Sequence, residues 1–257
     1  GCRALKSAIL SYCEVIYDYA FAKCTSLEYA YFPICSLIGS FAFNSCAGLK
    51  NVVFPTCKDI SEYAFAECTA LETINFPDCQ NISEYAFAEC TALETINFSN
   101  CTNIGSHAFE HCSELISVYA PRCVSIGEFA FSGCKKLQAQ SVFKSCSYVG
   151  SWAFFGVNLL SELILYSCNY IGSGAFDRTR LSRIYLRSSS VCIMHNSVFH
   201  QTLSLSGYET LSRPLMKSIN VFVPGSLFSV YLEKPPFNGQ LSVPSMSTQP
   251  SLFLNYY

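Results

Sequence analysis

Residues 60–76 read ISEYAFAECTALETINF, and residues 82–98 repeat the same letters 22 positions later. The period extends well beyond this pair. An Ala-Phe pair recurs eight times, at residues 20–21, 42–43, 64–65, 86–87, 108–109, 130–131, 153–154 and 175–176. Each unit approximates I-G/S-x-x-A-F-x-x-C-x-x-L-x-x-I-x-F-P-x-C-x-x. Self-similarity at a fixed short period predicts a solenoid, in which each repeat stacks on its neighbours.

Each repeat has two parts of different texture. The second part, for example LETINFPDC at residues 71–79, alternates apolar and variable residues, which predicts a strand with one buried face. The first part, for example ISEYAFAEC at residues 60–68, opens with Ser or Gly at a cap-like position and continues with Ala and aromatic residues. This texture predicts a short helical turn. Eight units stacked at about 4.8 Å per strand would form a curved rod roughly 40 Å long.

The sixteen cysteines follow the same period. Thirteen of them lie 11 residues apart, from Cys2 to Cys134, and the last three are Cys146, Cys168 and Cys192. Repetition should place them in two columns along the rod. We interpret these columns as ladders of buried thiols. Disulfides between adjacent rungs are the first alternative. Metal binding is the second, although no CxxC or Cys/His cluster has the spacing of a ligand set.

Composition limits the possible functions. Hydrophobic residues make up 51% of the 257 residues and charged residues only 13%, so a packed core is expected over most of the chain. The net charge is −2, which provides no basic face for nucleic acid or an anionic membrane. No apolar run approaches the roughly 18 to 20 residues of a membrane span. The chain opens GCRALKSAIL, and we interpret it as trimmed, with its targeting segment removed.

Written from the strand, the unit is L-x-x-I-x-F-x-x-C-x-x-I, as in Leu71, Ile74, Phe76, Cys79 and Ile82. This pattern resembles the leucine-rich repeat. The A-F-x-x-C segment resembles more particularly the BspA-like class, which is common in bacterial cell-surface proteins and in some anaerobic protists. The resemblance implies an α/β solenoid, a right-handed superhelix of about eight strand-plus-short-helix repeats with a C-terminal cap. It also implies a secreted or surface-anchored binding protein that adheres to host matrix or to other cells.

The resemblance covers residues 1–190, which we expect to form the leucine-rich repeat solenoid. Residues 191–257 are expected to form an irregular cap and tail. Within them, residues 219–231 (INVFVPGSLFSVY) resemble the strand-plus-helix cap of the family, and residues 232–257 are rich in Pro and Ser and match nothing in the family.

Catalytic groupings are scarce. His107 and His111 would share one face of a helical turn, but no third ligand accompanies them, and we interpret both as parts of a solvated convex face. Cys192 with His195 and His200 is a weak candidate for a Cys-His nucleophile. We therefore predict no enzyme activity, no catalytic residue, no metal site and no cofactor.

The outward strand positions are the expected interaction surface, on the concave side of the solenoid. They are polar in the middle repeats and carry aromatic and charged residues towards the ends. Because Tyr and Arg most often anchor protein interfaces, the candidate partner-binding residues are Tyr29, Tyr31, Tyr119, Tyr166, Arg183, Tyr185 and Arg187.

The leading hypothesis is a monomeric, non-enzymatic module, extracellular or at the cell surface. It would present this face to a host-matrix or cell-surface protein, or to a glycan, and would not bind nucleic acid. The alternative is a structural spacer within a larger surface protein, with no ligand of its own.

Overall fold

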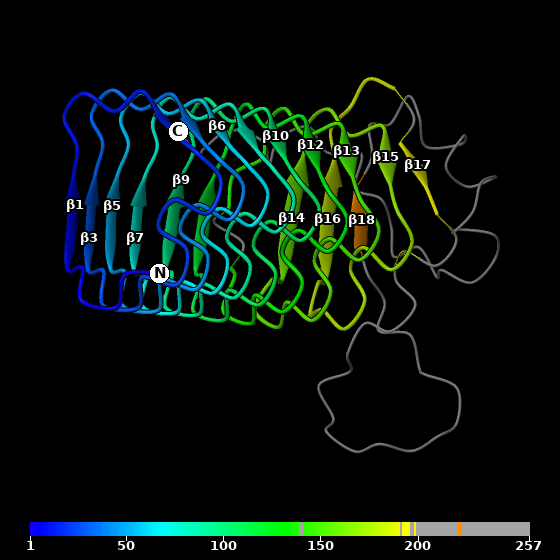
Figure 1. Ribbon diagram of the computed structural model, residues 1–257. Coiled ribbons are helices and arrows are strands. Elements are labelled where there is room, and N and C mark those ends of the chain that lie inside the picture. Colours follow the sequence, from blue (N-terminus) through cyan, green and yellow to red (C-terminus); the bar gives the residue numbers. More distant parts are fainter. Residues whose placement is uncertain (139–140, 191, 196–197, 199–219, 223–257) are drawn as a thin grey trace, which may run out of the picture.

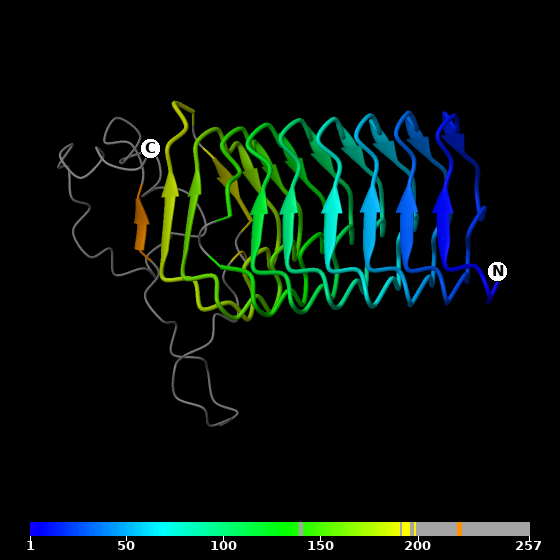
Figure 2. The ribbon, with the colours of Figure 1, turned by 90° about the vertical axis from the view of Figure 1, so that its left-hand side faces the viewer.

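The computed structural model shows the repeats as successive coils of a β-solenoid, stacked in sequence order along one axis (Figures 1 and 2). It describes residues 1–138, 141–190, 192–195, 198 and 220–222. The strands are β1 (Ser7–Ile9), β2 (Val15–Ile16), β3 (Tyr29–Tyr31), β4 (Leu37–Ile38), β5 (Asn51–Val53), β6 (Asp59–Ile60), β7 (Thr73–Asn75), β8 (Asn81–Ile82), β9 (Thr95–Asn97), β10 (Asn103–Ile104), β11 (Ser117–Tyr119), β12 (Ser125–Ile126), β13 (Tyr148–Val149), β14 (Glu162–Leu165), β15 (Tyr170–Ile171), β16 (Arg183–Leu186), β17 (Ile193–Met194) and β18 (Asn220–Phe222).

The strand expected in the second part of each repeat is confirmed, except in the repeat that opens at Ile126, where the described residues form only an isolated bridge between Tyr119 and Val142. These strands pair in parallel, in the order β1-β3-β5-β7-β9-β11, and we call them the long-strand sheet. In β7 the side chain of Ile74 is buried and its neighbours Thr73 and Asn75 are exposed, because successive residues of a strand point to opposite faces. Each residue pairs with the residue one repeat away, for example Tyr29 with Asn51, so the repeat period sets the register.

A second sheet was not predicted from the sequence. The aliphatic residue that opens each repeat belongs to a two-residue strand, such as β8, where Asn81 is exposed and Ile82 is buried. These short strands pair in parallel in the order β17-β15-β13-β12-β10-β8-β6-β4-β2, and we call them the short-strand sheet. Each coil therefore presents apolar side chains to the interior from two sheets.

The prediction of a short helix in each repeat is wrong, since the described residues contain none. Tyr63 and Glu67 have φ angles of 54° and 61°, in the left-handed region that ends a right-handed helix. The N–H groups of Tyr63, Phe65 and Glu67 donate to carbonyls of the next coil, whereas the N–H groups between them donate three residues back within the turn. This alternation uses the backbone for contacts between coils and leaves no run of i→i−4 bonds.

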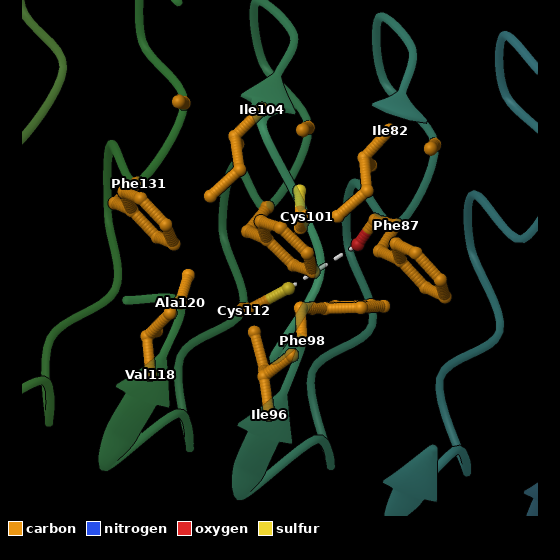
Figure 3. Close-up of a cluster of buried hydrophobic side chains, with 14 of the residues drawn as sticks. Ile82, Phe87, Ile96, Phe98, Cys101, Ile104, Cys112, Val118, Ala120 and Phe131 are labelled. Carbon is orange, nitrogen blue, oxygen red and sulfur yellow. Dashed lines mark hydrogen bonds between the residues drawn. The ribbon is translucent and has the colours of Figure 1, made fainter. Parts of the chain in front are cut away.

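The core consists of columns that run through the coils. The phenylalanine of each Ala-Phe pair stacks on its counterpart in the next coil, with ring centroids 5.0–5.7 Å apart from Phe21 to Phe176. A second column from the long-strand side, including Phe54 and Phe76, packs edge to face against the first. Figure 3 shows this packing around Phe87, with isoleucines of both sheets closing the interior. Burying each such ring contributes about 1.5–3 kcal/mol to folding, so every coil depends on its neighbours.

At the C-terminal end, β14, β16 and β18 form a separate parallel sheet, which we call the C-terminal sheet (Figure 1). Its strands β14 and β16 occupy the same position within their repeats as the strands of the long-strand sheet do within theirs. Both β17 and β18 belong to the segment expected to form the irregular cap. The domain boundary at residue 190 remains a prediction. The helical part of the cap expected within residues 219–231 and the tail at 232–257 lie outside the described residues.

Candidate interaction surfaces and thiol ladders

The structure places the seven candidate partner-binding residues in three groups and does not bring them together. Tyr29 and Tyr31 lie on β3, near the N-terminal end of the solenoid, and their side chains flank the buried Ala30. Tyr29 is exposed and Tyr31 is half-buried. Next to them on β1, the outward Ile9 is exposed as well, so this end of the long-strand sheet presents an apolar and aromatic surface.

The middle of the long-strand sheet is polar. On β7 and β9 the outward residues are Thr and Asn, and Thr73 donates a hydrogen bond to Asn51 at 2.8 Å. Tyr119 on β11 lies at the end of this polar stretch, and its side chain is exposed. It alone makes up the second group. It lies at the same register position as Asn97, as the sequence predicts.

The third group, at the C-terminal end, is a contiguous patch. Arg183 and Tyr185 lie on β16, paired with Glu162 and Ile164 of β14. The guanidinium of Arg183 lies 3.1 Å from the Glu162 carboxylate, and that of Arg187 lies over the ring of Tyr166, 5.2 Å from its centroid. We call Tyr166, Arg183, Tyr185 and Arg187 the C-terminal patch. It combines two cations and two aromatic rings in the arrangement that protein interfaces favour.

The cysteine ladders are present, and no disulfide joins any of the sixteen cysteines. One column follows the Ala-Phe turns, and from Cys46 to Cys134 its thiols donate to a carbonyl of the preceding coil, as Cys112 does to Phe87 at 3.2 Å (Figure 3). The other column follows the long strands, and from Cys13 to Cys168 its thiols donate to the carbonyl two residues further on, as Cys101 does to Asn103. We call them the turn column (Cys2, Cys24, Cys46, Cys68, Cys90, Cys112 and Cys134) and the strand column (Cys13, Cys35, Cys57, Cys79, Cys101, Cys123, Cys146, Cys168 and Cys192).

Burial makes these thiols hard to ionise. It raises the pKa of Cys35 to about 11 and the pKa values of Cys101 and Cys123 to about 12. The pKa of Cys192 is also raised, first by its hydrogen bond with Cys168 and then by burial. A cysteine nucleophile needs the opposite shift, so Cys192 is poorly suited to that role. His195 lies beside it in the chain, and His200 lies outside the described residues.

The histidine pair does not lie on a helix. His107 and His111 have φ angles of 57° and 60°. The Nδ1 atom of His107 lies 2.7 Å from Glu110, and Nε2 of His111 lies 3.9 Å from the other oxygen of the same carboxylate. Within the described part of the chain, no group of three or more His, Cys, Asp or Glu side chains is arranged to hold a metal ion. His111 is exposed, in line with a solvated face, whereas His107 is half-buried.

His107 is half-buried because its ring belongs to a ladder of stacked aromatic side chains, which was not predicted from the sequence. Rings at the third position after the opening aliphatic residue stack along the outside of the turns, with centroids 4.3–5.2 Å apart. At the end of the ladder, a Cβ on Gly174 would lie 2.4 Å from Nε1 of Trp152, so a glycine is needed beneath that indole. The signal was in the sequence, because an aromatic residue occupies this position in seven consecutive repeats: Tyr19, Phe41, Tyr63, Tyr85, His107, Phe129 and Trp152.

Comparison with known families explains the repeat. The pattern described as BspA type leucine rich repeat region matches residues 14–125 and 115–219, in six copies. The chain belongs to this BspA-type leucine-rich repeat family. The comparison with curated proteins found no significant match.

Two solved structures of bacterial leucine-rich repeat proteins resemble this BspA-type chain. A leucine-rich repeat protein of Bacteroides ovatus superposes with a TM-score of 0.61 at 24% identity, over 71% of this chain and 51% of its own. The chain thus spans about half the length of that protein. The leucine-rich repeat protein TpLRR of T. pallidum gives a TM-score of 0.53 at 26% identity, over 69% of this chain and 78% of its own. Among the described residues, no helix is long and apolar enough to cross a membrane.

Proposed function

We propose that this BspA-type solenoid is a non-enzymatic interaction module, secreted or exposed at the cell surface. It binds a protein or glycan partner, in an adhesion-like role, through the outward side chains of its long-strand and C-terminal sheets. Membership in a family of leucine-rich repeat proteins supports the general role. The partner, the surface location, the monomeric state and the curvature that would make this face concave belong to the proposal.

The C-terminal patch is the observation that supports a binding role most strongly. The interior of the described coils consists mainly of apolar side chains and thiols, so the outward positions are the ones most free to vary. In the middle coils those positions hold Thr and Asn, whereas at the C-terminal end they hold Arg183, Tyr185 and their neighbours. Arginine and tyrosine side chains contribute most of the binding energy at many interfaces, so the partner is expected at this end.

The repeat-to-repeat uniformity supports the alternative function. Residues 60–76 and 82–98 are identical, and their outward Thr and Asn residues form a plain polar surface. A spacer needs length and stability but no particular surface. A structural spacer in a larger surface protein would therefore also be built from such coils.

Paired substitutions distinguish the two functions. Arg183→Ala/Tyr185→Ala removes half of the C-terminal patch, Tyr29→Ala/Tyr31→Ala removes the N-terminal pair, and Thr95→Ala/Asn97→Ala on β9 is the matched control. Binding of each variant to immobilised fibronectin, laminin and collagen and to a glycan array is measured by biolayer interferometry. We expect the unmodified chain to bind at least one of these, and the β16 variant to bind at least tenfold more weakly, with the control unchanged.

If the Tyr29→Ala/Tyr31→Ala variant and the Arg183→Ala/Tyr185→Ala variant both bind as well as the unmodified chain, the partner site has been misplaced. If the unmodified chain binds none of the probes, the spacer is favoured. Circular dichroism of each variant checks that the solenoid is intact, because the substituted side chains point away from the core.

A further inference from the structure

The strand column ends in a contact between two sulfur atoms. From Cys13 to Cys168, each thiol of this column donates to the carbonyl two residues further along its own coil. At Cys192 the sulfur instead lies 3.4 Å from Sγ of Cys168 and 3.9 Å from the carbonyl oxygen of Ile193. Among the hydrogen bonds of the described residues, the one between Cys192 and Cys168 joins two sulfur atoms, and no second bond of this kind is seen there.

A local change in the repeat causes this contact. The N–H of Gly172, four residues after Cys168, donates to Val149 at 2.8 Å, and the equivalent bond in the next coil is made by His195, three residues after Cys192, to Ile171 at 3.0 Å. The link between the cysteine and its short strand is therefore one residue shorter in the last coil. Met194, the residue two positions after Cys192, therefore lies inside β17, and the Cys192 sulfur lies beside Cys168 of the neighbouring coil.

From this geometry we propose that Cys168 and Cys192 are a disulfide-forming pair that links the last two coils when a disulfide-bearing oxidant is present. Extending the register of β15 and β17 sets Cys192 beside Asn169, one residue past Cys168. With a strand spacing of about 4.8 Å and a rise of about 3.3 Å per residue, this offset gives a Cα–Cα distance of about 5.8 Å, within the 4.4–6.8 Å range that disulfides span. The two sulfurs need to approach by only about 1.4 Å to reach the bond length of about 2.05 Å. Elsewhere in the column, hydrogen bonds to carbonyls of the same coil hold the thiols in other directions.

The reaction is a thiol–disulfide exchange in two steps. Once the last coil has opened and exposed it to water, Cys192 loses its proton to solvent, and its thiolate attacks one sulfur of the oxidant R–S–S–R, which releases R–S⁻ and forms a mixed disulfide. Cys168 then loses its proton, and its thiolate attacks the Cys192 sulfur, which releases the second R–S⁻. Both leaving thiolates take up a proton. Two protein thiols are oxidised to one disulfide, and one oxidant disulfide is reduced to two thiols.

Both sulfur atoms are buried, so the exchange requires the last coil to open. Its strand β17 is the edge of the short-strand sheet, with β15 as its neighbour among the described strands. Edge elements of a stacked array open more easily than central ones. We therefore expect oxidation to be slow and to join this pair, because the thiols of the central coils are covered on both sides and those of the N-terminal coil have no sulfur contact of this kind in the described structure.

The test uses the full chain carrying Cys2→Ser and Cys13→Ser, which remove the exposed and the half-buried thiol, and Cys146→Ser, which simplifies peptide assignment. Trypsin cleaves after Lys144, Arg178 and Arg187, so Cys146 and Cys168 share one peptide and Cys192 lies in another. The reduced protein is incubated with oxidised glutathione in native buffer, and its remaining thiols are alkylated in denaturant and counted. We expect two fewer thiols than in the untreated protein, and a cross-linked pair of peptides containing Cys168 and Cys192.

Adding Cys192→Ser should abolish the loss of thiols. The proposal is overturned if the native protein loses no thiols, if cross-links are spread over several rungs, or if the Cys192→Ser chain loses the same two thiols. The peptide map of the protein that retains Cys192 decides the matter even if the serine variant folds poorly.

Discussion

At the scale of single residues, the turns combine strained backbone with compensating contacts. Two residues in each turn have positive φ angles, and outside glycine this costs roughly 1–2 kcal/mol each. At Tyr85 the conformation is held by a hydrogen bond from its N–H to Ser106 at 3.0 Å and by stacking on two rings. In other coils glycine stands at the second strained position, at Gly133 and Gly156, where this cost is absent.

The thiols act as small buried donors. Where the turn column departs from cysteine, Val157 occupies the site without a donor, and Thr179 directs its hydroxyl to the Phe176 carbonyl at 2.7 Å. The position therefore requires a small, largely apolar side chain, and a sulfur atom is not essential for the fold.

Cysteine replacement tests this role. Cys90→Ala leaves a small void and removes the bond to the Phe65 carbonyl, so the free energy of unfolding should fall by about 1–2 kcal/mol. Glu72→Ala, at an exposed position of the preceding repeat, is the control and should change it by less than about 0.5 kcal/mol. Urea denaturation followed by circular dichroism measures both values, and equal losses would contradict the packing role.

At the scale of elements, the turns are a third layer of inter-coil contact and do not act as linkers. The sequence predicts a helix for them because Ser, Ala and aromatic residues satisfy local helix rules. The observed conformation depends on bonds such as that from the Phe65 N–H to Ala86, whose acceptor is on the next coil. A prediction from one repeat cannot include that acceptor, which is why the strands were found and the turns were not.

The aromatic ladder should stabilise the solenoid according to the number of neighbouring rings. Tyr85 stacks between Tyr63 at 4.6 Å and His107 at 4.3 Å, whereas Tyr19 stacks on Phe41 alone at 4.9 Å. Tyr85→Ala should lower the free energy of unfolding by about 1–3 kcal/mol, and Tyr19→Ala by less than about 1 kcal/mol. Both changes leave alanine at a positive φ, so the backbone cost is similar in the two variants. The difference between the two losses of unfolding free energy therefore reports the contribution of ring stacking.

Urea denaturation of the two tyrosine variants, with the unmodified chain alongside, provides this difference. If Tyr19→Ala costs as much as Tyr85→Ala, the ladder does not contribute through its stacked rings.

At the scale of the whole molecule, the period determined most of what the sequence could predict. It predicted the stacked coils, the two thiol columns and the register of outward residues, because each of these follows from equivalent positions in consecutive repeats. It could not predict the contact between Cys168 and Cys192, which arises where the period fails. The three groups of candidate binding residues are separate because they lie in different parts of the stack, and stacking does not bring distant coils together.

The duplicated segment behaves as a structural unit. Cys68 and Cys90 donate to Phe43 and Phe65 with the same 3.2 Å distance, and the turn residues of the two copies have φ angles within a few degrees of each other. Identical residues in identical surroundings give identical coils. The copies thus contribute length and core, and the distinctive surface lies outside them.

Alkaline pH should unfold the chain. Burial raises the pKa of Cys101 and Cys123 from about 9 to about 12, so the folded state keeps protons that the unfolded chain loses. The stability that this provides is fully present below about pH 9 and is lost as the pH rises towards 12, by about 1.4 kcal/mol per pH unit for each thiol. Circular dichroism between pH 8 and 12 should show cooperative unfolding in this window, and a signal unchanged up to pH 12 would contradict it.

The count of reactive thiols tests the stacked solenoid most directly. After full reduction and removal of the reductant, the native chain is treated with a thiol-reactive dye at pH 8, with and without denaturant. Fourteen cysteines are buried, whereas Cys2 is exposed and Cys13 is half-buried. We predict one or two fast-reacting thiols in the native protein and sixteen in denaturant. Rapid reaction of most thiols in the native protein would contradict the account.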